Sequence, residues 1–157
     1  MSTNNILIHK IFNDNVLEIT LNNPTKRNPL SLQIIISLQK VLDKLKKDKK
    51  IKVVLLKSTG ASFCSGHDLK EVRKYSSSHL KLLDLFKRCS KMMISLREIP
   101  QPVIACVDGI AAAAGCQLVA SCDLAIATKS SYFQTPGVNI GLFCSTPMVA
   151  ISRKIAP

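Results

Sequence analysis

The stretch that decides the fold is VIACVDGIAAAAGCQLVASCD, residues 103–123. Its first five residues are apolar, which predicts a buried strand at 103–107. Gly109 then breaks the strand, and small residues carry the chain into a helix. Four consecutive alanines between Gly109 and Gly115 leave almost no side chain at this junction. A ligand could therefore approach the backbone here, although tight packing of a helix on a strand selects the same residues.

An earlier part of the chain follows the same plan. The run IKVVLLKS at 51–58 predicts a buried strand, and the glycine-containing loop TGASFCSGHD leads to a helix that begins near Asp68. Two strand cores, 53–56 and 103–107, each feed a glycine-marked loop and then a helix. This repetition predicts an α/β fold of stacked ββα units, with parallel strands in layers and helices outside.

The rest of the chain carries local signals for further elements. Strand-like runs at 6–11 and 16–21 flank FNDN, which predicts a hairpin. Ser31 precedes a run with apolar residues at helical spacing, so a capped helix is expected over 32–47. The other predicted elements are a helix at about 79–97 with Leu83, Phe86, Met93 and Leu96 on one face, a strand at 123–128, a loop-rich stretch at 130–143 and a helix start at Ser145-Thr146-Pro147.

The C-terminal segment PMVAISRKIAP begins an amphipathic helix that stops within about three turns. A natural domain rarely ends before its last helix can bury a face. We therefore expect one domain over residues 1–157 that is truncated at Pro157.

Composition limits the possible classes of function. The 157 residues are 46% hydrophobic and 20% charged, a mixture typical of a soluble globular domain. The net charge of +12 comes partly from a lysine-rich stretch at 40–52, which we interpret as a solvated helix face rather than a nucleic-acid site. Such a surface would attract small anions, including phosphate-bearing ligands. No apolar run is long enough to span a membrane, and no secretory or transit signal is visible, so the predicted location is cytoplasmic.

The cysteines show neither a disulfide framework nor metal-ligand spacing. They lie mostly among apolar neighbours, which is typical of small buried side chains in a reducing compartment. No metal site is expected from them. The six are Cys64, Cys89, Cys106, Cys116, Cys122 and Cys144.

The two glycine-marked junctions are the candidate sites for chemistry. The first turn of a helix has N–H groups without intrahelical partners. Junctions on neighbouring repeats can bring two such N–H groups to one place, where they would stabilise a carbonyl oxygen that gains negative charge. No GxSxG, GxxxxGK[ST] or GxGxxG motif offers another route. His67 near Cys64 is interpreted as a bystander, since residues three apart at a tight turn need not face each other.

Four motifs together resemble the enoyl-CoA hydratase/isomerase (crotonase) superfamily, and they occur in the family's order along nearly the whole chain. The resemblance implies a crotonase-like ββα spiral whose C-terminal helical part is missing here. It also implies an acyl-CoA thioester as substrate, with coenzyme A as part of that substrate and no permanently bound cofactor. The motifs are LNNPTKRNPLS (21–31), ASFCSGHDLKEV (61–72), IPQPVIACVDGIAAAAGCQLVASCDLAIAT (99–128) and FQTPGVNIGLF (133–143).

The resemblance assigns roles to particular positions. The backbone amides of His67 and Ala114 would form the oxyanion hole that polarises the thioester carbonyl and stabilises its enolate. The residues from Ser65 to Lys70 would line the coenzyme A chain, with Lys70 meeting a phosphate. The positions implied to bind substrate are Ser65, Gly66, Asp68, Leu69, Lys70 and Gly115.

The chain departs from the family pattern at both acid positions. Gln117 stands where hydratases of the family carry one catalytic Glu, and Gly137 stands where they carry the other. Hydration needs a base to activate water and an acid to protonate the α-carbon, and neither residue titrates at working pH. If the site is otherwise intact, replacing both positions by Glu is expected to raise hydration. Cys144, Ser145 and Thr146 lie further along, where other branches of the family place a catalytic group, and a hydroxyl or thiol there could orient a thioester or a water. Helix capping alone explains Ser145-Thr146-Pro147, so we prefer that interpretation.

These features support three hypotheses about function. The first is an acyl-CoA-binding enzyme, enoyl-CoA hydratase/isomerase-like, that works through an enolate without the standard acid–base pair. The second is a catalytically inactive acyl-CoA-binding or regulatory protein of fatty-acid metabolism. The third, nucleic-acid binding through residues 40–52, depends on charge alone. For the family member, the resemblance implies a homotrimer or a dimer of trimers, located in the mitochondrial matrix if the source is eukaryotic.

Overall fold

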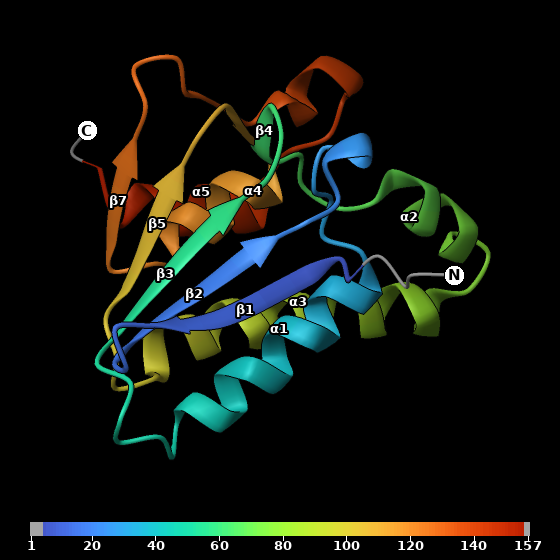
Figure 1. Cartoon of the computed structure of the whole chain (residues 1–157). Coiled ribbons are helices and arrows are strands. Elements are labelled where there is room, and N and C mark those ends of the chain that lie inside the picture. The colour runs from blue at the N-terminus through green and yellow to red at the C-terminus, as the bar shows by residue number, and fades with distance from the viewer. Residues whose placement is uncertain (1–4, 156–157) are drawn as a thin grey trace.

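The computed structural model describes residues 5–155, and the predicted truncation at Pro157 lies outside them. Five strands form the main sheet in the order β1-β2-β3-β5-β7 (Figure 1). The first two strands are an antiparallel hairpin, and the remaining pairs are parallel. The strands are β1 (Leu7–Phe12), β2 (Val16–Leu21), β3 (Val53–Ser58), β5 (Val103–Val107) and β7 (Leu124–Ala127).

A second sheet contains three short parallel strands in the order β4-β6-β8. Along the chain, β4 follows β3, β6 follows β5 and β8 follows β7. Each repeating unit therefore contains one strand of the main sheet, then one strand of the second sheet, and then a helix. The predicted loops at 62–64 and 132–134 and the predicted turn into a helix at 110–112 are therefore wrong. Three-residue strands are too short to show alternation; SFC, the β4 sequence, is buried throughout. The strands are β4 (Ser62–Cys64), β6 (Ile110–Ala112) and β8 (Tyr132–Gln134).

Five α-helices complete the described residues. Helices α1 and α3 pack against each other, and α4 packs against α5 (Figure 1). Two short 3-10 helices lie at Pro24–Lys26 and Pro136–Ile140. The α-helices are α1 (Leu32–Leu45), α2 (Leu69–Tyr75), α3 (His79–Glu98), α4 (Ala114–Ala120) and α5 (Ser145–Ser152).

The predicted helix starts are largely confirmed. The Ser31 hydroxyl accepts the N–H of Ile34 and caps α1. The Asp68 carboxylate accepts N–H groups of the first turn of α2. Helix α5 begins at Ser145 as predicted, but Cys144 occupies its N-cap position and makes no side-chain cap bond. The interpretation of the Ser145 hydroxyl as a cap is therefore wrong.

The buried face of α3 differs from the prediction in its first half. Met93 and Leu96 are buried, whereas Leu83 and Phe86 are 38% and 40% exposed. Helix α3 packs on α1 along its later turns, where Met92 and Cys89 join the core. Phe86, on an earlier turn of α3, instead contacts the ring of His67.

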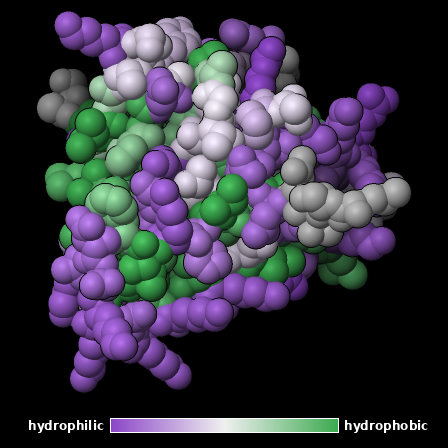
Figure 2. Space-filling model, in the orientation of Figure 1, coloured by the Kyte–Doolittle hydropathy of each residue, from purple (hydrophilic) through white to green (hydrophobic). Residues whose placement is uncertain are grey.

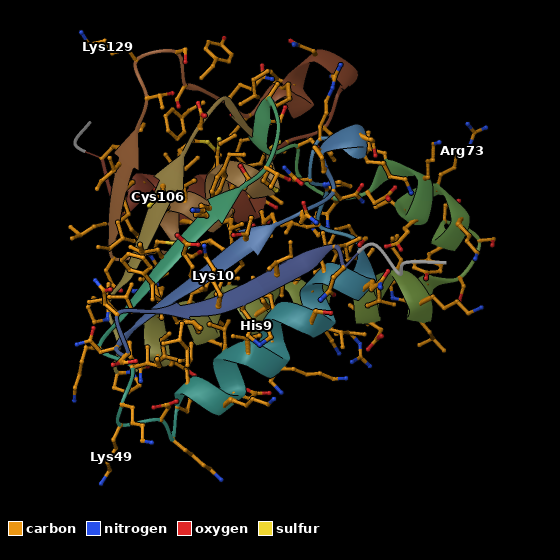
Figure 3. All side chains as sticks on the ribbon, in the orientation of Figure 1. His9, Lys10, Lys49, Arg73, Cys106 and Lys129 are labelled. Atoms are coloured by element: carbon orange, nitrogen blue, oxygen red, sulfur yellow. The ribbon has the colours of Figure 1, made fainter. Side chains whose placement is uncertain are left out.

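The lysine-rich stretch is a solvated surface, as predicted. Its apolar residues Leu42, Leu45 and Ile51 are buried in the core, and its lysines are exposed. Figure 3 shows Lys49 of this stretch extending away from the rest of the protein, at the lower left of the view. The surface in the same part of Figure 2 is hydrophilic.

The outer face of the main sheet is partly polar. Glu18 on β2 forms ion pairs with Lys10 at 3.2 Å and Lys57 at 2.8 Å. Cys106 on β5 lies beside this group and is half-buried, unlike the other five cysteines, which are buried as predicted. All six thiols are free. No helix within residues 5–155 is long and apolar enough to cross a bilayer.

Candidate active site

The two glycine-marked junctions meet in space. Gly66 has a φ of +90°, and a Cβ placed there would lie 3.0 Å from the Ala112 carbonyl oxygen and 3.4 Å from the Ala114 nitrogen. Only glycine accepts both this conformation and this approach without strain. The loop after β4 therefore rests directly on the turn that begins α4.

Strand pairing holds the junctions together. Strands β4 and β6 run parallel, with Cys64 in register with Ala111. Gly115 lies against the Cys64 carbonyl, and Gly109 lies against the Ala61 carbonyl, so a side chain at either glycine would overlap backbone. The packing explanation for these two glycines is therefore correct.

Hydrogen bonds orient the two predicted oxyanion-hole amides. The Gly66 carbonyl accepts the N–H of Leu30 at 2.7 Å, and the Ala113 carbonyl accepts the N–H of Gln117 at 3.2 Å. The Gly66 carbonyl shares a peptide group with the His67 N–H, and the Ala113 carbonyl shares one with the Ala114 N–H. Because the N–H and C=O of a trans peptide point in opposite directions, these two N–H groups point away from Leu30 and Gln117, respectively. Neither N–H is bonded to an acceptor within residues 5–155.

Ala113 carries backbone strain at the start of α4. Its φ of +48° and ψ of −116° lie outside the regions that alanine normally occupies. The Gln134 carbonyl on β8 accepts its N–H at 2.8 Å and helps to hold this conformation. Such a residue costs on the order of 1–3 kcal/mol, and strain of this kind is concentrated at functional sites.

A cavity of about 300 Å³ lies where α3, α4 and the segment before α5 meet at these junctions. It brings together three of the predicted residues, His67, Ala114 and Gln117. Its lining is mostly apolar, which lowers the local dielectric and strengthens any hydrogen bond made inside it. The lining residues are His67, Phe86, Cys89, Ser90, Ala113, Ala114, Gln117, Leu142, Phe143, Cys144, Ser145, Thr146 and Pro147.

A second cavity of about 320 Å³ adjoins the first. Gln117, Ser90, Ser145 and Thr146 line both, so they form the boundary between them. The remaining walls are apolar side chains of α3 and α5, with the guanidinium groups of two arginines. These further residues are Met93, Ile94, Arg97, Ser121, Val149, Ala150 and Arg153.

Gln117 is 8% exposed, and its backbone carbonyl accepts the hydroxyl of Ser121 at 2.7 Å. It projects from α4 one turn after Ala114, at the boundary of the cavities. Its amide can donate or accept a hydrogen bond there but cannot transfer a proton near neutral pH.

The imidazole of His67 lies beside Phe86, and both residues line the first cavity. It meets the ring of Phe86 edge to face, with ring centroids 5.0 Å apart. Burial lowers the pKa of His67 below its ordinary value of 6.5, and the nearby Leu30 carbonyl opposes this effect to a smaller extent. His67 is therefore neutral at pH 7.

Gly137 does not line either cavity. A Cβ at this position would lie 2.5 Å from the Cys144 sulfur and 2.6 Å from the Leu142 carbonyl oxygen. A glutamate here would meet these atoms before reaching the cavity. The expectation that Glu at both positions 117 and 137 restores hydration is therefore not supported, because the second position is closed by packing.

The other residues implied to bind substrate lie outside both cavities. The Ser65 N–H donates to the Arg27 carbonyl, and Asp68 caps α2. Leu69 is 71% exposed, and Lys70 is also exposed on the first turn of α2. Their role toward coenzyme A stays a prediction.

Cys64 does not provide a nucleophile for His67. Its thiol is fully buried, does not line the cavity, and has a pKa raised to about 12 by burial. The described residues also contain no group of three or more His, Cys, Asp and Glu side chains placed to hold a metal ion.

Asn28 is a buried structural residue whose role the sequence does not indicate. It is fully buried, and its amide donates to the Thr59 and Ser62 carbonyls, both at 2.8 Å, while its oxygen accepts the N–H of Asn23 at 2.7 Å. These bonds fix the turn that leads into β4 and so into the Gly66 junction. The only local signal is its place in a proline-marked loop, which does not reveal burial.

Comparison with known proteins identifies sequence relatives. The family model described as "Enoyl-CoA hydratase/isomerase" matches residues 11–157. The human protein "Enoyl-CoA hydratase domain-containing protein 3, mitochondrial" is 49% identical over 142 residues, covering 90% of this chain and 46% of the human one. "Putative enoyl-CoA hydratase/isomerase YngF" of Bacillus subtilis is 33% identical over 138 residues, covering 87% of this chain and 52% of that protein. The chain spans about half the length of these curated relatives.

Solved structures share the fold. An enoyl-CoA hydratase from Mycobacterium smegmatis superposes with a TM-score of 0.92 at 44% identity, covering 97% of this chain and 59% of that one. The crystal structure of human enoyl-CoA hydratase domain-containing protein 3 gives a TM-score of 0.88 at 47% identity, covering 94% and 58% respectively. The α/β spiral of ββα units predicted from the sequence is confirmed.

Proposed function

The chain belongs to the enoyl-CoA hydratase/isomerase family, and on that premise we propose that it binds an acyl-CoA thioester and stabilises the enolate of its acyl group. In this proposal, the backbone amides of His67 and Ala114 donate to the thioester oxygen. The observation that carries it is that two N–H groups, neither with an acceptor among residues 5–155, belong to junctions in direct contact whose residues His67 and Ala114 line one cavity.

The chemistry required of this site is electrostatic. Removing a proton from the α-carbon of a thioester moves negative charge onto the carbonyl oxygen. Fixed N–H donors in a mostly apolar cavity stabilise that charge without reorganising, and losing one such donor typically costs a factor of about 10²–10³ in rate. The strained backbone of Ala113 supports a donor held in place before substrate arrives.

The adjoining cavity provides room for the acyl chain. It is reached past Gln117, and its apolar walls from α3 and α5 suit a hydrocarbon. The exposed basic residues on α2, Lys70 and Arg73 among them, suit the phosphates of coenzyme A (Figure 3). No permanently bound cofactor is needed for this arrangement, since coenzyme A arrives as part of the substrate.

A second candidate function is acyl-CoA binding without turnover, as in a regulatory protein of fatty-acid metabolism. Gln117 and the closed position at Gly137 favour it, because the two carboxylates of the standard hydration route are absent. The site would then hold the thioester carbonyl and Gln117 would only orient it.

Two measurements on the intact protein separate these functions. Calorimetry with butyryl-CoA, compared with free coenzyme A, is expected to show tighter binding of the thioester. Loss of the enoyl absorbance of crotonyl-CoA would then establish hydration, whereas binding with unchanged absorbance favours the second candidate. No difference between butyryl-CoA and free coenzyme A would overturn the role of the two amides.

Assembly and location are proposed from the family. We expect a homotrimer or a dimer of trimers. The apolar side chains of Leu124 and Ile126 on β7 are exposed, which supports burial of this surface on assembly. Sedimentation of the intact protein tests this, and a monomer would contradict it. The human relative is named as mitochondrial, which supports the matrix as the location if the source is eukaryotic, and otherwise we expect the cytoplasm.

A further inference from the structure

The residues that line the cavity include one histidine, whose imidazole is the side chain that ordinarily titrates nearest neutral pH. Of its lining residues only His67, Cys89 and Cys144 have titratable side chains. The Cys89 thiol has its pKa raised to about 12 by burial. The site that lacks both family glutamates therefore still contains an imidazole.

We propose that the imidazole of His67 takes the α-proton of the bound thioester and returns it, in the place of the missing carboxylates. This inference rests on the proposed function, because it requires an acyl-CoA held by the amides of His67 and Ala114. It assigns two separate roles to His67, one to its backbone N–H and one to its side chain.

The orientation of the ring supports this role. Nδ1 is shielded from solvent and has no well-formed hydrogen bond within the described residues, although the Leu30 carbonyl lies near the ring. His67 and Phe86 both line the cavity, and we assign Nε2, the ring nitrogen that is not shielded in this way, as the one that faces it. The contact with Phe86 of α3 fixes the ring plane, with an interplanar angle of 86°.

The protonation state is the one a base needs. Burial keeps the ring neutral at pH 7, with the Leu30 carbonyl opposing more weakly. The other titratable groups near it are Cys89 on α3, Cys144 before α5, and Asp68, whose carboxylate is engaged in capping α2. No carboxylate lines the cavity to hold a positive charge on the ring.

The step balances without a further reactant. The C–H bond at the α-carbon breaks, its proton passes to Nε2, and its electron pair forms the enolate whose charge lies on the thioester oxygen. The reverse step returns a proton from the imidazolium to the α-carbon. In D₂O the proton on nitrogen exchanges with solvent, so deuterium enters the acyl group.

The test is deuterium incorporation at the α-carbon of butyryl-CoA, a thioester that cannot be hydrated, measured by mass spectrometry with the intact protein in D₂O. Wild type is expected to catalyse exchange. The variants His67→Gln and His67→Ala keep the backbone N–H, so they should bind butyryl-CoA within about threefold of wild type but exchange at least about 100-fold more slowly. His79→Gln, on the exposed start of α3, is the matched control and should exchange as wild type does.

Two further readouts distinguish proton transfer from a structural role. Wild-type exchange should fall as pH drops through a value below 6.5, and His67→Gln should lose that inflection. Added imidazole should partly restore exchange in His67→Ala. Equal exchange in wild type and His67→Gln overturns this inference and leaves the proposed function intact. Butyryl-CoA binding without exchange in wild type overturns this inference and favours the second candidate function, binding without turnover. Absence of butyryl-CoA binding in wild type overturns both.

Discussion

Glycine at position 137 is the residue that most limits the chemistry of this site. The chain packs the Cys144 sulfur and the Leu142 carbonyl into the space that a side chain would need. A carboxylate side chain at this position would therefore require the loop to take another shape. By contrast, Gln117 remains at the cavity boundary and differs from Glu only in its head group.

Gly137→Ala should destabilise the fold by roughly 1–3 kcal/mol, because a methyl group must displace packed atoms. Urea unfolding at pH 7 measures this. The control is Val138→Ala in the same 3-10 helix, whose side chain is 67% exposed and whose loss should change stability by less than about 0.5 kcal/mol. A Gly137→Ala protein as stable as wild type would show that the loop has room for a side chain.

His67 should make stability depend on pH. Its pKa is lower in the folded state than in the unfolded chain, where it is about 6.5. As pH falls below that value, the unfolded chain binds a proton that the folded protein does not, so stability decreases until pH reaches the folded pKa. Urea unfolding between pH 7.5 and 5 is expected to show a decline that is smaller in His67→Gln. An identical decline in the two proteins would contradict the burial of this imidazole.

At the scale of elements, the signals that predicted correctly were local ones. Ser31 and Asp68 mark helix starts by their own side chains, and the β1-β2 hairpin is visible in two runs of strand-forming residues. The strands β4, β6 and β8 were missed because three residues carry no period, and their identity depends on pairing with one another.

The candidate site was predictable to the same extent. Gly66 and the alanine run are local features, so they located the two strand-to-helix junctions. The repeated ββα plan then predicted that junctions of neighbouring repeats meet. The environment of the His67 ring was not predictable, since Phe86 reaches it from a different helix. The closure around Gly137 likewise depends on a loop that returns to it at Cys144.

The N-cap of α2 supports the segment that carries His67. Asp68→Ala should destabilise the protein by about 0.5–2 kcal/mol, because two first-turn N–H groups lose their acceptor. Asp68→Asn keeps a side-chain oxygen and should cost much less. Thermal unfolding monitored by circular dichroism compares the two variants, and equal losses would show that the charge rather than the cap matters.

Asn28 joins two loops to the turn before β4. Asn28→Ala should cost roughly 2–4 kcal/mol, since it leaves the Thr59 and Ser62 carbonyls without their donor. Asn28→Asp keeps the shape but removes the amide donors, so it should be destabilising as well. Asn139→Ala, at an exposed position, is the control for the urea unfolding measurement. Stability of Asn28→Asp equal to wild type would exclude the donor role.

At the scale of the whole molecule, the two sheets have different roles. The five-stranded sheet, with α1 and α3, contains most of the apolar core. The three-stranded sheet ends at the junctions and positions the N–H groups of His67 and Ala114. In the proposed function, this scaffold presents the two N–H groups to a thioester carbonyl, with Gln117 and the His67 ring beside them.

The central claim is that two backbone N–H groups bind a thioester oxygen in the His67–Ala114 cavity. Difference infrared spectroscopy of butyryl-CoA labelled with ¹³C at the carbonyl, free and bound to the intact protein, tests it most directly. Two donors on one oxygen weaken the C=O bond, so the account predicts a stretch at lower frequency in the complex than in water. A bound thioester whose carbonyl frequency equals or exceeds its value in water would contradict it.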